Sequence, residues 1–311
     1  MFNKILFATC ARDACDPAAR LVFDLGQRYH AHIYVFHVFG VPTHGYSQVV
    51  IDLITGDEII LDENYVDFVK EEIRDYCDQM RKDSEAYSFE VTIGFPHREI
   101  LRYARRIDPD LIVMGGSTGD PDVSFYKKTM TGSTYQRVAK AARCPVLVVT
   151  RPSAASGGHF SNVLFSTDFS AADDAAFEFA FRLVQEQEPD GEFHLFHALD
   201  ISGIQTNKFH TREYIEGKIR EAKALIGNKY VSRMGAFKPY TVNVWEGIPS
   251  VEIVRYAGEK DADLIVLAYH TKKTQTGDAP FKNIVEQVID RAHCPVVSVN
   301  QYAGKQNEII M

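Results

Sequence analysis

Short apolar runs alternate along the chain with longer stretches in which apolar residues recur every three or four positions. The run Lys4–Thr9 has the length and composition of a buried strand. Between Tyr65 and Met80, apolar residues spaced at four, four, three and four positions fall on one face of a helix. Asp16 and Pro17 open another helix, because proline is tolerated in a first turn. The pattern predicts strands at 4–9, 32–38, 89–93, 111–114, 146–149, 163–165, 192–197, 241–244, 264–267 and 296–299, and further helices at 99–106, 172–186, 213–230 and 251–256.

The second half of the chain repeats the first. Leu111–Gly115 reappears as Leu264–Ala268, and Arg143–Val149 reappears as His293–Val299. A repeat of about 150 residues has the size of a whole domain. We therefore expect one domain at 1–151, a small flexible linker at 152–159 and a second domain at 160–311. Strands that alternate with helices predict an α/β fold of two repeated, doubly wound domains, each a five-stranded parallel sheet with helices on both faces.

One region differs between the two copies. Val49–Leu61 contains two apolar runs about Thr55, Gly56 and Asp57, which predicts a hairpin or a lid. The counterpart near Ile201–Arg212 is shorter and more polar. An additional element of this kind is therefore expected only in the first copy.

Composition narrows the class of protein. The 311 residues carry a formal net charge of −8, which gives no global attraction to nucleic acid or to anionic lipid. No apolar run approaches the roughly 20 residues of a membrane span. The chain starts directly with a strand-like segment, and its five cysteines are scattered and odd in number. These features predict a cytoplasmic protein with no nucleic-acid partner and no membrane span.

A glycine-rich segment follows the fourth strand of the first copy. It contains Gly115, Gly116 and Gly119, and Gly132 and Ser133 then precede a helix that ends near residue 143. Glycines let a backbone approach a ligand closely, and a helix N-terminus offers free N–H groups to a phosphate. The two elements together predict a phosphate cradle.

Simple helix capping remains the alternative for this segment. Ser133 and Gln136 have the spacing of a capping box, as do Asn283 and Glu286 in the second copy. The second copy thus starts the same helix without a Gly-Ser pair, which favours phosphate binding in the first. Ser170 is expected to cap a helix in the same way.

These motifs resemble the universal stress protein family in its tandem, two-domain form, and the resemblance covers nearly the whole chain. Gly116-x2-Gly119 and Gly132-Ser133 match the family's glycine motif, although twelve residues rather than nine separate the two parts. A Gly-x-Pro motif occurs at Gly94 and again at Gly247. The resemblance implies an adenine nucleotide alpha hydrolase-like fold and a site for ATP or another adenine nucleotide, with or without Mg²⁺. The residues that it implies at this site are Ala8, Thr9, Cys10, Val38, Met114, Gly116, Gly119, Gly132, Ser133 and Thr134. It implies that the glycines, Ser133 and Thr134 hold phosphate and ribose, and that Ala8, Thr9 and Val38 lie beside the base.

The two copies keep opposite halves of the family pattern. The first copy has the glycines, but Cys10 stands where the family has an aspartate. The second copy keeps that aspartate as Asp168, whereas Lys272 and Lys282 replace glycines. Bulky side chains there should fill the space of a triphosphate. We therefore expect one nucleotide site, in the first copy. Asp168 is interpreted either as a ligand contact or as a polar strand-end residue.

The remaining chemistry-bearing residues favour structural roles. Cys10 and Cys15 could suggest redox chemistry, but their spacing is not Cys-x-x-Cys, and a small buried Cys10 is the favoured interpretation. His37 and His197 occupy equivalent strand positions and are expected in the core or at a strand end rather than on a metal. We see no motif for a zinc site or for a Ser/His/Asp site.

The main hypothesis is a stress-response regulatory protein that acts through nucleotide occupancy. By resemblance, the two copies pack as an intrachain pseudo-dimer through 146–149 and 296–299, and the chains form a homodimer. Two alternatives stay open. One is a binding module for a small apolar ligand, and the other is a slow ATPase with weak hydrolysis at most.

Overall fold

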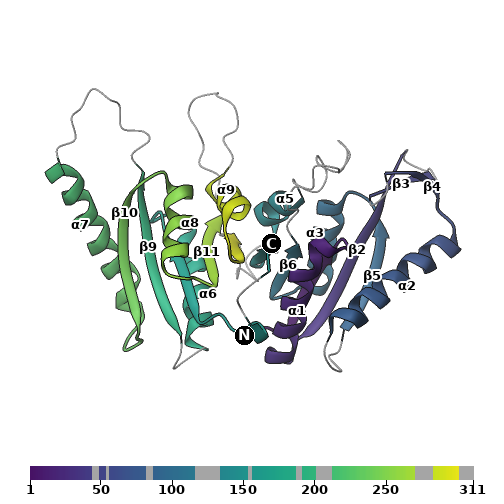
Figure 1. The fold of residues 1–311 in the computed structure, drawn as a ribbon, viewed down its shortest axis with the longest axis horizontal. Helices are drawn as coiled ribbons and strands as arrows, with labels where there is room; N and C mark the ends of the chain where they lie inside the picture. The colour runs from purple at the N-terminus through teal and green to yellow at the C-terminus, as the bar shows by residue number, and fades with distance from the viewer. Residues whose placement is uncertain are drawn as a thin grey trace, which may run out of the picture. The chain divides into compact units, whose positions relative to one another are not determined.

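A computed structural model describes residues 1–43, 49–53, 56–81, 87–115, 134–152, 156–186, 191–200, 212–269 and 283–300. These residues divide into two compact units, the first ending at Gly158 and the second beginning at His159. Each unit is a twisted sheet with helices on its two faces (Figure 1). The α/β fold of two doubly wound domains predicted from the alternating pattern is confirmed.

Five parallel strands form the main sheet of the first unit as far as it is described. Their order is β5-β2-β1-β6-β7, so the chain runs outward on one side of β1 and then returns to its other side. Apolar residues dominate these strands because both faces of a parallel sheet are covered. The strands are β1 (Lys4–Thr9), β2 (His32–Pro42), β5 (Tyr87–Ile93), β6 (Leu111–Gly115) and β7 (Val146–Val149).

The helices of this unit form two layers. The first layer, α1 and α2, packs against one face of the sheet, and the second layer, α3 and α5, packs against the other. A short 3₁₀ helix, η1, immediately precedes α1, and another, η2, packs against α1 at the end of the linker. The bounds are η1 (Asp13–Cys15), α1 (Asp16–Tyr29), α2 (Glu63–Met80), α3 (Pro96–Ile107), α5 (Thr134–Ala141) and η2 (Ser156–Gly158).

The hairpin predicted in the first copy is present. Strands β3 (Val49–Asp52) and β4 (Glu58–Ile60) pair antiparallel, and β3 continues the sheet along the end of β2. The buried Asp52 accepts a hydrogen bond of 2.7 Å from the Tyr65 hydroxyl, which ties the hairpin to α2. β2 is longer than predicted, because its last residues pair with this hairpin.

The second unit repeats the arrangement. Its strand order is β10-β9-β8-β11-β12, all parallel, with α6 and α7 on one face and α8 and α9 on the other. The strands are β8 (Asn162–Ser166), β9 (Glu192–Asp200), β10 (Tyr240–Gly247), β11 (Leu264–Tyr269) and β12 (Val296–Asn300). The helices are α6 (Asp173–Gln185), α7 (Arg212–Lys229), η3 (Val231–Arg233), α8 (Pro249–Glu259) and α9 (Ile284–Arg291).

The Gly-x-Pro motif has the same physical origin in both units. Gly94 and Gly247 have φ of 143° and 151°, which side-chain-bearing residues rarely adopt. A Cβ on either glycine would also lie 2.7 Å from Cγ of a first-turn glutamate, Glu99 or Glu252. The following proline then starts the helix with its fixed φ.

Two predicted helix caps have different outcomes. Asn283 caps α9, because its side chain accepts a hydrogen bond of 3.0 Å from Val285 N–H. Ser170 does not cap α6, and this prediction is wrong. The side chain that serves the turn before α6 is Asp173, which accepts hydrogen bonds from the Thr167 hydroxyl at 2.7 Å and from the backbone N–H of Asp168 at 3.0 Å. Among the helices described, none is long and apolar enough to cross a membrane.

Candidate functional site

The candidate site of the first unit lies where β1 separates the two directions of winding. Such switch points bind ligands outside the carboxyl ends of the strands. Ala8 on β1 pairs with Met114 on β6, and Thr9 pairs with His37 on β2, next to Val38. The structure therefore brings Ala8, Thr9, Val38 and Met114 to one end of three adjacent strands.

Exposure of the strands increases toward this end. Along β1, residues 5–7 are fully buried, whereas Ala8 and Thr9 are 8% and 7% exposed. Val38 is also 8% exposed and Met114 is 5% exposed. Each of these residues thus keeps a small exposed surface at this end of the sheet, and three of the four are apolar.

The glycine motif lies mostly outside the described residues. Gly116, Gly119, Gly132 and Ser133 fall there, so their contact with phosphate stays a prediction. Thr134, the last predicted site residue, is the first residue of α5. The N-terminus of α5 therefore follows directly on the predicted phosphate segment.

Cys10 differs from its predicted environment. It is partly exposed rather than buried, and its backbone N–H donates a hydrogen bond of 3.3 Å to the sulfur of Cys15. Cys15 lies in η1, which packs against the end of β6. A Cβ on Gly115 would lie only 2.8 Å from the Cys15 sulfur, so glycine is needed there for this close approach. The sequence spacing of the two cysteines did not reveal this contact.

The two strand histidines have the predicted structural role. His37 Nδ1 lies 2.9 Å from the carbonyl oxygen of Thr9, and His197 Nδ1 lies 2.8 Å from that of Thr167. Burial lowers the pKa of His37. Each histidine thus donates to the end of the central strand, and the bond fixes the turn that follows it.

A basic cluster lies at the N-termini of α3 and α5, and the sequence analysis missed it. Arg137 NH1 is 3.4 Å from Nδ1 of His97, and Arg98 is adjacent. Burial lowers the pKa of His97, and the charges of Arg137 and Arg98 lower it further. The cluster therefore concentrates positive charge beside a helix N-terminus in a chain whose net charge is −8.

The second unit has neutral residues at the matching positions. Ser250 follows the Gly-x-Pro motif as His97 does, and Gln287 stands seven residues before a Cys-Pro pair, as Arg137 does. The Ser250 hydroxyl donates a hydrogen bond of 2.9 Å to Gln287 Oε1. Comparing the halves in this way would have revealed the basic cluster from sequence.

In the second unit, side chains cap the N-terminus of α9 and make its first turn acidic. The Asn283 side chain accepts a hydrogen bond from the Val285 N–H, and Glu286 places a negative charge in the first turn of the helix. Tyr269, which matches Gly116 of the first copy, is buried and its hydroxyl lies 3.4 Å from Glu286 Oε1. Lys272 and Lys282 lie outside the described residues. This helix end is thus already capped and acidic, which disfavours an anion.

Asp168 has the polar strand-end role in this unit. Its Oδ1 accepts a hydrogen bond of 3.1 Å from Ser170 N–H, and its own N–H donates to Asp173. These bonds close the turn between β8 and α6. They account for the residue without a ligand.

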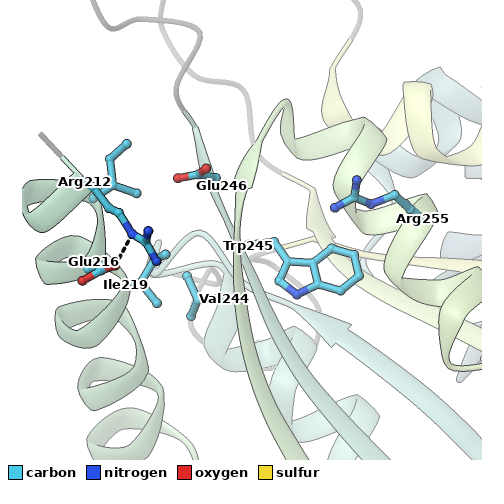
Figure 2. Close-up of a pocket in the computed structure, with 8 residues that line it drawn as sticks. Arg212, Glu216, Ile219, Val244, Trp245, Glu246 and Arg255 are labelled. Atoms are coloured by element: carbon cyan, nitrogen blue, oxygen red, sulfur yellow. Dashed lines mark hydrogen bonds and ion pairs between the residues drawn. The ribbon is translucent and has the colours of Figure 1, made fainter. Parts of the chain in front are cut away.

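A hollow of about 610 Å³ lies at the edge of the second unit, around the carboxyl end of β10. Figure 2 shows Val244 on the α7 side of this strand and Trp245 on the α8 side. Arg212 and Glu216 form an ion pair at 2.8 Å, and the Arg255 guanidinium lies 4.6 Å from the centre of the Trp245 ring. The lining is therefore mixed in polarity, and it lies at the edge strand rather than at the switch point between β8 and β11.

The strand orders define a class: a protein of two Rossmann-type parallel-sheet domains, each with a switch point at its central strand, where proteins of this class bind ligands. The family model of the universal stress protein family matches residues 1–150 and 159–300. The chain therefore belongs to the universal stress protein family and contains two of its domains.

Relatives and solved structures agree with this assignment. The universal stress protein MJ0531 of Methanocaldococcus jannaschii is 28% identical over 164 residues, which cover 49% of this chain and 84% of that protein. The universal stress protein YxiE of Bacillus subtilis is 27% identical over 157 residues, which cover 48% of this chain and 99% of that protein. A universal stress protein from Archaeoglobus fulgidus has the same fold over 98% of both chains, with a TM-score of 0.64 and 20% identity.

Proposed function

We propose that this protein is a regulatory universal stress protein that binds one adenine nucleotide, ATP or a related form, in its first unit. The base would lie on Ala8, Thr9, Val38 and Met114, with Cys10 at the rim. The phosphates would lie between the glycine segment and the N-terminus of α5. Nucleotide binding is typical of the family, and the arrangement of this chain's own residues supports it in the first unit.

The observation that carries the proposal is the difference in charge between the two matching helix ends. In the first unit, Arg137 adds positive charge in the first turn of α5, beside His97, whose lowered pKa keeps it neutral at neutral pH. In the second unit, Asn283 caps α9 and Glu286 makes its first turn acidic. A polyphosphate is attracted to the first environment and repelled by the second. The two ends share a fold, so fold alone does not explain the difference.

Regulation would follow from occupancy. Nucleotide in the crevice would fix the segment between Gly116 and Gly132, and a partner or second protomer would bind that state more tightly than the empty one. We further propose that the two units of one chain pair through β7 and β12, and that two chains associate. Both assemblies are hypotheses that rest on the family resemblance.

Ligand identity and stoichiometry test the proposal. Purified protein would be denatured, and the released small molecules identified by mass spectrometry. Calorimetric titration with ATP, ADP and AMP should give one site per chain. Gly132→Val should abolish binding and Lys282→Gly should leave it unchanged. Two sites per chain, or equal binding by Gly132→Val, would reject the assignment.

The same samples test the alternative functions. A released apolar molecule, with no nucleotide bound in titration, would favour the apolar-ligand module. Phosphate release with Mg²⁺ would favour the ATPase if Gly132→Val stops it. A rate that Gly132→Val leaves unchanged would come from a contaminant.

A further inference from the structure

The same turn follows the central strand in both units. The Ala11 N–H donates to the Thr9 hydroxyl oxygen at 2.9 Å, and the Phe169 N–H donates to the Thr167 hydroxyl oxygen at 2.9 Å. Ala11 and Phe169 both have positive φ, 51° and 65°. The two turns can therefore be compared atom by atom, although their side chains differ.

Cys15 occupies the position of a carboxylate in this comparison. In the second unit, Asp173 accepts hydrogen bonds from the Thr167 hydroxyl and from the Asp168 N–H. In the first unit, the Cys15 sulfur accepts from the Cys10 N–H at 3.3 Å. A site that holds a carboxylate in one half thus holds a sulfur in the other, with the matching backbone N–H directed at it.

The residue before this turn completes a thiol pair. Cys10 matches Asp168, and the hydrogen bond from its backbone N–H places the Cys15 sulfur beside residue 10. The neighbouring Cys10 side chain lowers the pKa of Cys15, whereas the Cys15 side chain and burial raise the pKa of Cys10. Donors around a sulfur stabilise its thiolate, which is the reactive form. Cys15 itself is 5% exposed, whereas Cys10 is partly exposed, so solvent reaches this turn on the Cys10 side.

We propose that Cys10 and Cys15 are a modification site that a small hydroperoxide converts into an intramolecular disulfide and that a dithiol reverses. The proposal is independent of nucleotide binding, because it rests on the geometry of the turn alone.

The chemistry balances with the hydroperoxide as the oxidant. The Cys15 thiolate attacks the O–O bond, takes one oxygen as a sulfenic acid and releases the other in the alcohol, or in water when the oxidant is hydrogen peroxide. Cys10 then attacks the Cys15 sulfur, forms the S–S bond and displaces the hydroxyl as water. Two thiols and one hydroperoxide give one disulfide, one alcohol and one water.

Peptide mapping tests the proposal on the full chain. Arg12 lies between the two cysteines, so trypsin separates them into peptides 5–12 and 13–20. After hydrogen peroxide treatment and blocking of free thiols with a maleimide, these peptides should remain joined and lack two hydrogen atoms. Dithiothreitol should separate them. Maleimide on both peptides after treatment, or a bond from either cysteine to a different one, would overturn the proposal.

Two variants supply matched controls. Cys15→Asp copies the second unit, keeps an acceptor for the turn and should abolish the linked peptides in a folded protein. Cys144→Ser removes another partly exposed cysteine of the same unit and should leave them unchanged. Loss of the linked peptides in Cys144→Ser, or their persistence in Cys15→Asp, would contradict the assignment.

Discussion

Replacing Arg137 by glutamine tests the electrostatic argument for the nucleotide site. Glutamine is the residue at the matching position 287, where it forms part of a neutral pair. The substitution therefore gives the first unit the charge of the second at this point. Arg137 is exposed, so its loss should change the attraction of phosphate with little effect on the core.

The size of the effect follows from Coulomb's law. A unit charge about 5 Å from a phosphate oxygen, at an effective dielectric constant of about 40, contributes about 1.7 kcal/mol. Exposure of Arg137 to water and salt reduces this to about 1 kcal/mol, so affinity for ATP should fall about 5-fold. Raising the salt concentration from about 0.1 M to about 1 M should shrink the difference toward unity.

Isothermal titration with ATP at both salt concentrations measures the effect. Arg106→Gln is the matched control, since it removes the same charge from the last turn of α3, about 14 Å along the helix from His97. It should change affinity less than twofold. Equal weakening by the two variants, or unchanged affinity in Arg137→Gln, would refute the local attraction that the argument requires.

Four further outcomes are expected. Gly115→Ala should lower the free energy of unfolding by about 1–3 kcal/mol in urea, because the new Cβ would lie 2.8 Å from the Cys15 sulfur; an unchanged midpoint would contradict the close approach. Gly217→Ala should raise the free energy of unfolding by about 0.8–1 kcal/mol, because Gly217 lies inside α7 and the atom nearest to a new Cβ would be 4.0 Å away. A lower stability of this variant would show that the new methyl group is crowded. Asn283→Ala should cost about 1 kcal/mol through the lost cap, and Asn283→Asp serves as a capping control. Burial raises the pKa of Asp263 from 3.8 to about 7, so the free energy of unfolding should fall as pH rises from about 4 to about 7. Asp263→Asn should flatten this fall. An equal pH dependence of stability in the two proteins would disprove the assignment to Asp263.

Hydrophobic spacing predicted the fold well because it reports burial directly. Lys4–Thr9 and Val146–Val149 have the predicted bounds, since each is a short apolar run buried on both faces. β2 extends to Pro42 beyond its predicted end, because its continuation depends on pairing with the hairpin. A strand end that is set by a partner distant in sequence leaves no local signal.

The candidate site shows the same limit. The strand-end location of Ala8, Val38 and Met114 follows from the strands that carry them, whereas their contact with a nucleotide stays a prediction that the family resemblance implies. The contact between Arg137 and His97 joins two helices forty residues apart, and no spacing rule reports it. The sulfur contact of Cys10 depends on the path of one turn, so the favoured interpretation of a buried, isolated Cys10 was wrong.

Trp245 is the sole tryptophan of the chain, and it lies in the second unit beside the Arg255 guanidinium. Intrinsic emission excited at the indole band therefore reports on that half of the molecule. A nucleotide bound on the first unit alone could leave this signal flat, so a silent fluorescence titration would not count against binding. For the same reason, a thermal melt that is followed by indole emission records the unfolding of one half, and the other half needs a probe of its own.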